Sequence, residues 1–289
     1  MLNVDYTLLE SQGYVVLPQF LADTELKTLR QDYETNQPEV PIAYNVRFVS
    51  NTNFDLFDQK LSQVLEQIKQ QTQLAVDLII PLGRYYHNNQ SAVDCFHQDH
   101  DAFYFLQQFY HYLNFWIPVT KPQADKSGLT VVPHNKLHEF SPDYAAMIRN
   151  YGACKYFPDG DSTVLVDDNT GLQHTIPINF ESIAVSPVLN EGDVLLMRGD
   201  TIHKTQDHDT ERLAVTIRCT NGQAPISRNK LLEFGCDDKQ RRLKNSHYLV
   251  DQALTIFNSK NSDTITPTEF YADMIKYHRY KGAQIPQNP

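Results

Sequence analysis

The N-terminal part of the chain carries two patterns of apolar positions that predict helices. After a short apolar run at 15–17, Asp23 is placed to cap a helix that carries Leu26, Leu29 and Tyr33 on one face. A second helix is predicted where apolar residues recur at i, i+3, i+4 and i+7. Those residues are Leu61, Val64, Leu65 and Ile68. We therefore expect residues 1–73 to be mainly helical.

From residue 74 the periodicity changes to that of strands. Segments 74–86 and 103–119 are rich in Ile, Val, Tyr and Phe, and the second alternates, with Leu113, Phe115 and Ile117 opposite Asn114 and Trp116. Further strand candidates, separated by turn signals, are 129–132, 163–166, 183–188, 194–198 and 212–219. A helix is predicted again near the end, where Thr266, Pro267 and Glu269 form a capping box with proline at the first helical position.

The order of these elements indicates the fold class. The sequence contains no internal repeat, low-complexity tract or linker, and its strands do not alternate with helices in βαβ units. This argues against Rossmann and TIM-barrel folds and favours a mainly β fold with flanking helices, either a sandwich or a jelly roll. We expect a single domain over 1–289, with a helical part at 1–73, a β core at about 74–220 and a helical part at 221–289.

Composition limits the kinds of molecule that the protein is expected to bind. The 289 residues include 25 Lys and Arg against 35 Asp and Glu, a net charge of −10, so we expect neither nucleic-acid nor anionic-membrane binding. The four cysteines form no CxxC pair, and the sequence shows no secretion signal and no apolar stretch of transmembrane length. We expect a cytoplasmic protein that binds a small molecule. The sequence does not indicate its oligomeric state.

The densest cluster of metal-capable side chains is the run His-Gln-Asp-His-Asp at 97–101. In an extended segment His97 and Asp99 point to the same side, so an imidazole and a carboxylate can meet one metal ion. Roughly one His-x-Asp is expected by chance in a chain with 11 His. The motif therefore needs support from elsewhere in the sequence.

That support comes from a second segment. Gly192-Asp193 begins an apolar strand, and a turn at Gly199-Asp200 brings His203 to the start of the next strand. In the strand that follows, Leu213, Val215 and Ile217 share one face, and the other face carries Arg212, Ala214, Thr216 and Arg218. The second face suits a polar pocket, where either arginine is able to bind a carboxylate through two nitrogens.

With these segments in place, the sequence resembles the phytanoyl-CoA dioxygenase family of non-haem iron, 2-oxoglutarate-dependent oxygenases. The resemblance spans roughly residues 8 to 220, in family order and at plausible spacing. The matching pieces are Gly13–Pro18, Phe20–Asp23, His97-x-Asp99, Trp116, Gly128–Lys136, Gly192–Leu196, His203 and Arg212–Ala214.

The resemblance implies a double-stranded β-helix, the jelly roll of cupin-like proteins, with Fe(II) bound by His97, Asp99 and His203. It implies that Arg212 holds the distal carboxylate of 2-oxoglutarate and that Gln98 and Trp116 line the cosubstrate pocket. The reaction it implies consumes O₂, releases succinate and CO₂, and hydroxylates a small organic molecule. Halogenating relatives lack the carboxylate ligand, so Asp99 favours hydroxylation, without excluding desaturation or cyclisation.

Two segments depart from the family pattern or are peculiar to this chain. The loop Pro133-His134-Asn135-Lys136 stands where the family often has Pro-Gly-Ser-His. The long polar segment from about 140 to 190 is expected to cover the pocket and select substrate. No basic cluster suited to coenzyme A lies near the motifs, which favours a free, amino-acid-like molecule or a natural-product intermediate as substrate.

Several alternatives stay open at this point. Arg218 competes with Arg212 for the cosubstrate carboxylate, and Arg84 is placed to reach an anionic group of a substrate or to lie on the surface of a strand. His100 and Asp101 match the doublet of some helical phosphohydrolases, although their flanks here are strand-like. The alternative functions are a jelly-roll protein that binds a metabolite without turnover and a cupin-type metalloenzyme that does not use 2-oxoglutarate.

Overall fold

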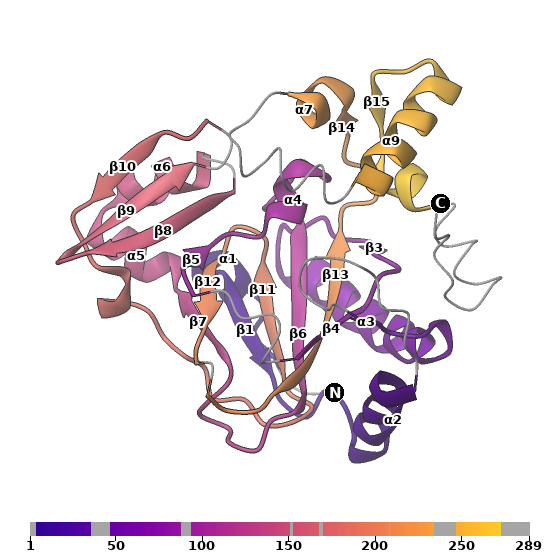
Figure 1. The fold of residues 1–289 in the computed structure, drawn as a ribbon, viewed down its shortest axis with the longest axis horizontal. Helices are drawn as coiled ribbons and strands as arrows, with labels where there is room; N and C mark the ends of the chain where they lie inside the picture. Colours follow the sequence, from indigo (N-terminus) through magenta and orange to yellow (C-terminus); the bar gives the residue numbers. More distant parts are fainter. Residues whose placement is uncertain are drawn as a thin grey trace.

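The structure is a computed structural model that describes residues 4–35, 47–87, 94–150, 153–167, 170–207, 209–233 and 247–272. Two antiparallel sheets face each other, and Trp116, Leu195 and Ala214 of the larger sheet pack against Leu129 and Val131 of the smaller one. Helices cover the outer face of the larger sheet (Figure 1). The structure therefore has the mainly β, jelly-roll-like architecture with flanking helices that the sequence predicts.

The larger sheet is built around two long central strands. Its order is β1-β11-β6-β13-β4-β2, with β3 also paired to β13. Its strands are β1 (Tyr14–Leu17), β2 (Arg47–Phe48), β3 (Leu78–Ile79), β4 (Arg84–His87), β6 (Tyr112–Thr120), β11 (Val194–Arg198) and β13 (Leu213–Thr220). All of these pairings are antiparallel.

The smaller sheet carries the metal-capable residues and extends beyond the core. Its order is β10-β9-β8-β5-β12-β7. Its strands are β5 (Phe96–His97), β7 (Leu129–Val132), β8 (Cys154–Asp159), β9 (Ser162–Asp167), β10 (Gln173–Ile176) and β12 (Ile202–Thr205). Strands β8 to β10 come from the 140–190 segment and project to the left of the core in Figure 1. This segment thus enlarges the sheet that carries His97 and His203, because β8 pairs directly with β5.

The predicted helices cover the larger sheet as their patterns require. After the short α1 (Leu8–Ser11), α2 (Asp23–Thr35) buries Leu26 and Leu29, and α3 (Asn51–Gln71) buries the predicted apolar stripe 61–68. Ser50 caps α3 by accepting a hydrogen bond from the backbone of Asn53. Asp23 is the first residue of α2, so it lies inside the helix rather than before it.

The alternation predicted for the two central strands is confirmed. Leu113, Phe115 and Ile117 of β6 lie in the cluster formed with α2 and α3, as do Leu213, Val215 and Ile217 of β13. Trp116 and Ala214 lie in the cluster between the two sheets. The side chains at 114, 116, 214, 216 and 218 therefore form the inner wall of the larger sheet.

Three predicted strands differ from the structure. Within 103–119, residues 100–104 form helix α4 (His100–Tyr104) and β6 begins only at Tyr112; between them Gln107 has a positive φ of 56°, which a strand does not allow. Segment 74–86 is split into β3 and β4 around Gly83. Segment 183–188 is not a strand, although Val185 makes an isolated bridge to Val131.

The C-terminal part combines helices with a small sheet. Helices α7 (Arg228–Leu232) and α9 (His247–Lys260) accompany the two-stranded sheet β14 (Ile226–Ser227) and β15 (Thr264–Ile265). The predicted capping box is present, because Glu269 accepts a hydrogen bond from the Thr266 amide while its own amide donates to Thr266 Oγ1. The predicted helix beyond 272 lies outside the described residues.

The remaining helices connect the sheets. The connecting helices are α5 (His134–Phe140), α6 (Pro142–Asn150) and the 3₁₀ turn η2 (Phe180–Ser182). Across the described ranges, every helix is too short or too polar to cross a bilayer.

Candidate metal centre

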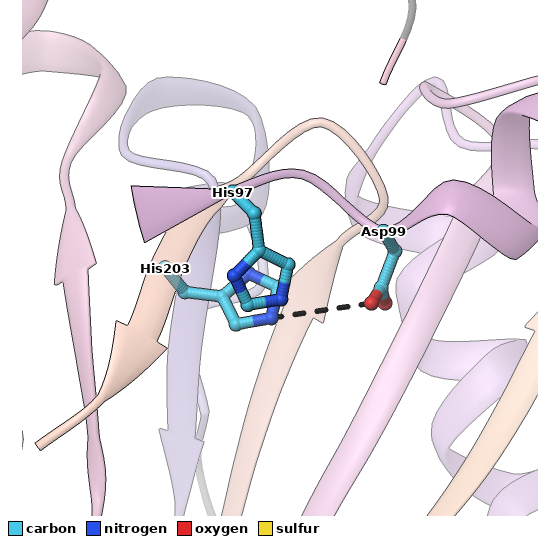
Figure 2. A group of neighbouring side chains, drawn as sticks. All are labelled: His97, Asp99 and His203. Carbon is cyan, nitrogen blue, oxygen red and sulfur yellow. Dashed lines mark ion pairs between the residues drawn. The ribbon is translucent and has the colours of Figure 1, made fainter. Parts of the chain in front are cut away.

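His97, Asp99 and His203 converge at one point between the two sheets. His97 on β5 and His203 on β12 are directly opposite each other in the antiparallel ladder, and their ring centroids lie 4.4 Å apart. Asp99 follows β5 and places Oδ1 3.9 Å from His203 Nε2 (Figure 2). Ligand atoms of the three residues all lie within 4.8 Å of one another. In the part of the chain that the structure describes, they are the only such group of three.

Backbone carbonyls orient both imidazoles toward that point. His97 Nδ1 lies 3.1 Å from the Cys95 carbonyl, and His203 Nδ1 lies 2.9 Å from the Thr201 carbonyl. A carbonyl oxygen only accepts, so each Nδ1 carries the proton and each Nε2 keeps its lone pair for a metal. The same local device, a carbonyl two residues earlier in the chain, therefore serves both histidines.

Asn114 of β6 orients the carboxylate. Its Nδ2 donates a hydrogen bond to Asp99 Oδ2 at 3.0 Å, and its buried Oδ1 makes no hydrogen bond. Since Oδ1 of Asp99 faces His203, this bond leaves that oxygen available for coordination. The contact also joins the inner wall of the larger sheet to the metal-capable residues of the smaller one.

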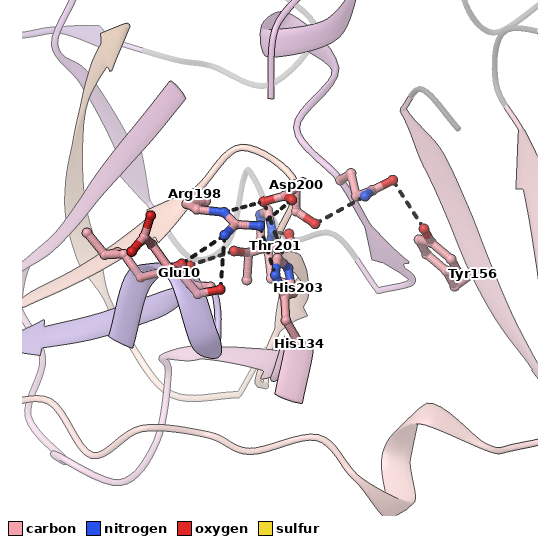
Figure 3. Close-up of polar contacts among 10 residues, drawn as sticks. Glu10, His134, Tyr156, Arg198, Asp200, Thr201 and His203 are labelled. Carbon is pink, nitrogen blue, oxygen red and sulfur yellow. Dashed lines mark hydrogen bonds and ion pairs between the residues drawn. The ribbon is translucent and has the colours of Figure 1, made fainter. Parts of the chain in front are cut away.

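A buried ion pair lies behind His203. Arg198 ends β11 and Asp200 lies in the turn before β12; Arg198 Nε donates to Asp200 Oδ1 at 2.9 Å, and Nη2 donates to Oδ2 at 2.5 Å (Figure 3). Their side chains are only 1% and 6% exposed. Arg198 Nη1 also donates to the carbonyls of Leu9 and Glu10 in α1. The pair thus fixes the turn before His203 to the N-terminal helix.

Two further residues make contacts around this ion pair and His203. His134 Nδ1 lies 3.0 Å from Arg198 Nη2, so segment 133–136, which the sequence suggests is a loop, is instead the start of α5 and lies behind the site. Thr201 donates its hydroxyl to the Gly13 carbonyl at 2.8 Å, and its own carbonyl is the acceptor for His203 Nδ1. The orientation of the His203 ring therefore depends on contacts with residues far apart in the sequence.

We expect Arg198→Met to lower the free energy of unfolding by about 3–5 kcal/mol, because it leaves the Asp200 carboxylate buried without its cation. Urea unfolding measures this change. Lys136→Met is the matched control, since Lys136 pairs with Glu139 on the surface and its loss should change stability little. Replacing both Arg198 and Asp200 with apolar residues should restore part of the loss. An Arg198→Met protein as stable as wild type would contradict this account of the pair.

Gln98 makes two buried side-chain hydrogen bonds. Its Nε2 donates to the Asp200 carbonyl at 3.1 Å, and its Oε1 accepts from the Tyr156 hydroxyl at 3.1 Å (Figure 3). The side chain is 1% exposed. The Gln98 side chain points away from the side shared by His97 and Asp99, because alternate side chains of an extended segment point to opposite sides. Gln98 therefore connects the turn before His203 to β8.

Arg212 and Trp116 lie together deeper between the sheets. Arg212 is 2% exposed, its Nη1 donates to the carbonyls of Ser127 and Gly128, and its Nε makes no hydrogen bond. Its guanidinium carbon lies 5.6 Å from the centroid of the Trp116 ring. Burial lowers the pKa of Arg212 to about 10, so the group is still cationic at neutral pH. The nearby negative charge of Asp207 opposes this lowering, but no described carboxylate forms an ion pair with Arg212, so the site holds a buried cation without a direct ion-pair partner.

Arg218 lies at the other end of the inner face of β13. It pairs in register with Asn114 on β6, and it lines a recess together with Arg84 of β4. Six residues at about 3.3 Å each separate the backbones of Arg212 and Arg218 by roughly 20 Å. The two arginines therefore belong to different parts of the interior.

The alternative based on His100 and Asp101 gains no support. His100 is the first residue of α4, and its ring centroid lies 6.3 Å from that of His97. It is not a member of the three-residue cluster, while the side chain of Asp101 lies outside the described ones.

Sequence reasoning missed the residues that support the ligands. Asn114 has one signal, since it is a lone amide in a strand of aromatic and apolar residues. Arg198 and Asp200 flank a glycine at a turn, which is a common surface pattern, so their burial gives no local signal.

Comparisons with known proteins agree with the expected family. The chain is similar to the non-heme alpha-ketoglutarate-dependent carbocyclase SnoK from nogalamycin biosynthesis, with 16% identity, a TM-score of 0.43 and coverage of 75% of this chain and 83% of that one. It is similar to EvdO2 from Micromonospora carbonacea var. aurantiaca complexed with 2-oxoglutarate, with 14% identity, a TM-score of 0.46 and coverage of 74% and 89%. It is also similar to HygX from Streptomyces hygroscopicus with iron bound, with 13% identity, a TM-score of 0.44 and coverage of 75% and 85%. No curated protein matches the chain. The family model for phytanoyl-CoA dioxygenase (PhyH) matches residues 9–215, and the chain therefore belongs to this family.

Proposed function

We propose that this protein is an Fe(II)- and 2-oxoglutarate-dependent oxygenase that hydroxylates a small organic molecule. The observation that carries the proposal is the presence, in the same interior, of a metal-capable cluster and a buried cation that forms no ion pair. His97, Asp99 and His203 form the cluster, and Arg212 provides the cation. Membership of the phytanoyl-CoA dioxygenase family supports the assignment.

The donor set of the cluster suits iron. Two imidazole nitrogens and one carboxylate oxygen are the ligands of the facial triad of non-haem Fe(II) oxygenases, which leaves half of an octahedral shell for other ligands. Both imidazoles are held in the tautomer that presents Nε2. Asn114 holds one oxygen of Asp99 and leaves the other facing His203. His97, Asp99 and His203 would therefore hold the iron.

The position of Arg212 suits the distal carboxylate of 2-oxoglutarate. In the β7–β12 ladder, His203 lies opposite Val131, and Gly128, whose carbonyl accepts from Arg212, comes three residues before Val131. At about 3.3 Å per residue, Gly128 lies roughly 10 Å along the ladder from the metal ligands. A dicarboxylate that reaches inward from the metal would pair with the guanidinium, whose Nε still has a hydrogen bond to donate.

The chain's own residues provide binding, orientation and exclusion of water. When bound, iron, 2-oxoglutarate and O₂ supply an oxidant for an unactivated C–H bond, with release of succinate and CO₂. Trp116, Leu129 and Val131 form an apolar interior between the metal cluster and Arg212. This interior limits the entry of water, which strengthens the electrostatic contacts of the cosubstrate. Asp99 occupies the third ligand position, and this favours hydroxylation over halogenation.

Succinate formation tests the proposal. The protein, reconstituted with Fe(II) and 2-oxoglutarate in air, is expected to form succinate, at a rate that rises with some member of a panel of amino acids, acyl thioesters and secondary metabolites. His203→Ala should reduce succinate to the level without protein, and Asp159→Ala, at the exposed end of β8, should not change it. The proposal is wrong if the wild-type protein forms no more succinate than His203→Ala does, both with every compound in the panel and with no compound added.

A further inference from the structure

A recess opens on the inner wall of the larger sheet, beside the metal-capable cluster. It is narrow: its enclosed part has a volume of about 20 Å³, and the remainder is open to solvent. Leu82, Phe105 and Tyr271 form apolar and aromatic parts of its lining, and Arg84 and Arg218 supply two guanidinium groups. A lining of this kind suits a ligand with an apolar body and an anionic group.

Strand register places the recess next to the metal ligands. Arg218 pairs with Asn114, and Asn114 donates a hydrogen bond to Asp99. Phe105 follows α4, the helix that begins directly after Asp99. A molecule bound in the recess would therefore be adjacent to the metal cluster, on the side away from the deeper Arg212.

The second arginine lies on the same wall. Arg84 pairs in register with Thr216, which is the inward-facing residue of β13 next to Arg218. Thr216 is 4% exposed, and its Oγ1 makes no hydrogen bond. A buried hydroxyl without a partner is unfavourable, and a polar group of a ligand on this wall would satisfy it.

The charge of this wall contrasts with that of the whole protein. The chain has a net charge of −10, but Arg84, Arg212 and Arg218 all belong to the inner wall of the larger sheet. The backbones of Arg212 and Arg218 are roughly 20 Å apart, so one small carboxylate does not engage both. A guanidinium carries five N–H donors, so Arg84 and Arg218 are each able to bind an anion and keep contacts within the protein.

We propose that Arg84 and Arg218 bind an anionic group of the substrate, a carboxylate or a phosphate, with the apolar remainder of the substrate against Leu82, Phe105 and Tyr271. This inference rests on the proposed oxygenase function and adds the substrate class. The guanidinium pair recognises the negative charge through charge-assisted hydrogen bonds. A neutral amide of the same shape lacks that charge and is bound more weakly.

Binding of matched ligands tests the inference. The probes are sets of compounds that share one aryl or alkyl body and end in a carboxylate, a phosphate monoester or a primary amide, such as 3-phenylpropanoate, 3-phenylpropyl phosphate and 3-phenylpropanamide. Dissociation constants are measured by calorimetry on the protein loaded with Fe(II) and 2-oxoglutarate without oxygen. In at least one set we expect an anion to bind about tenfold or more tightly than its amide. The carboxylate and phosphate arms show which anion is preferred.

Variants assign the preference to the two arginines. Arg218→Gln and Arg84→Gln should each reduce the anion preference to about threefold or less, whereas the dissociation constant of 2-oxoglutarate stays within about twofold. Arg218→Lys keeps the charge and should keep part of the preference, which separates loss of charge from misfolding. Arg228→Gln, a change in α7, is the matched control and should leave the preference at the wild-type value.

Each contrary outcome has a definite meaning. If no set shows an anion preference, or if the preference survives both glutamine substitutions, the inference is wrong. If Arg218→Gln abolishes 2-oxoglutarate binding, then Arg218 binds the cosubstrate and the inference is again wrong. Failure of the wild-type protein to bind iron or 2-oxoglutarate contradicts the proposed oxygenase itself, whereas normal cosubstrate binding with equal affinity for acid and amide contradicts only the substrate assignment.

Discussion

Replacing Asp99 with alanine is expected to weaken Fe(II) binding by at least about 100-fold and to abolish succinate formation. Asp99 offers the only carboxylate in the proposed metal cluster, and its Oδ1 lies 3.9 Å from His203 Nε2. Loss of an outer-sphere partner typically reduces metal affinity 10- to 100-fold, so loss of a direct ligand should exceed that range. Competition against a chromogenic chelator without oxygen measures the Fe(II) dissociation constant.

Two further variants show whether the effect is specific. Asn114→Leu removes the hydrogen bond to Asp99 Oδ2 and should weaken Fe(II) binding about 10- to 100-fold, an effect intermediate between wild type and Asp99→Ala. Asp159→Ala removes an exposed carboxylate of the same sheet and should leave the affinity unchanged. Wild-type affinity in Asp99→Ala would show that this residue is not a ligand.

Replacing Arg212 with glutamine is expected to raise the dissociation constant of 2-oxoglutarate by about 30-fold or more and to leave Fe(II) affinity unchanged. Arg212 is a cation that is only 2% exposed. It would form a buried charge pair with the carboxylate of 2-oxoglutarate, and the loss of one partner of such a pair costs about 2–5 kcal/mol. Calorimetric titration with 2-oxoglutarate in the presence of Fe(II) measures the change. The metal site should be unaffected, because Gly128, which Arg212 contacts, lies roughly 10 Å from the metal ligands along the β7–β12 ladder.

Comparison with Arg218 decides between the two candidate arginines. Arg218→Gln should leave 2-oxoglutarate affinity within about twofold of wild type. Arg212→Lys should be intermediate, because a lysine keeps the charge but loses the planar pair of donors. An unchanged dissociation constant in Arg212→Gln would remove Arg212 from the cosubstrate site.

Much of the fold follows from local sequence patterns. The alternation in β6 and β13 predicts correctly which side chains face the helices and which face the second sheet. The helical stripe at 61–68 and the capping box at Thr266 are also confirmed, because each depends on residues within one or two turns. Such patterns contain the information that local structure needs.

Tertiary contacts override the pattern elsewhere. The aromatic residues at 103–105 have strand propensity, yet α4 begins at His100 and Phe105 lies in an apolar cluster with Ala253, Phe257 and Tyr271. Val185 forms only an isolated bridge, so its segment does not become a strand. Strand propensity reflects how well a side chain packs on a sheet, so residues that pack against other elements need not form strands.

The candidate site also combines features that local sequence predicts with features that depend on distant residues. The spacing of His97 and Asp99 is local, and the structure brings them together with His203. Each imidazole is oriented locally by a carbonyl two residues earlier, but the contacts that hold Asp99 and the turn before His203 join residues 15 to 189 positions apart, such as Asn114 with Asp99 and Arg198 with Leu9. The hydrogen bonds of Gln98 to Tyr156 and Asp200 likewise join distant residues, and local sequence does not predict them.

Visible absorption during an anaerobic titration tests the central claim most directly, namely that His97, Asp99 and His203 hold Fe(II) and that 2-oxoglutarate joins it there. We expect a weak charge-transfer band that requires both Fe(II) and 2-oxoglutarate, that is absent in Asp99→Ala and His203→Ala, and that needs more 2-oxoglutarate in Arg212→Gln. The absence of the band in the wild-type protein at saturating Fe(II) and 2-oxoglutarate would contradict the account.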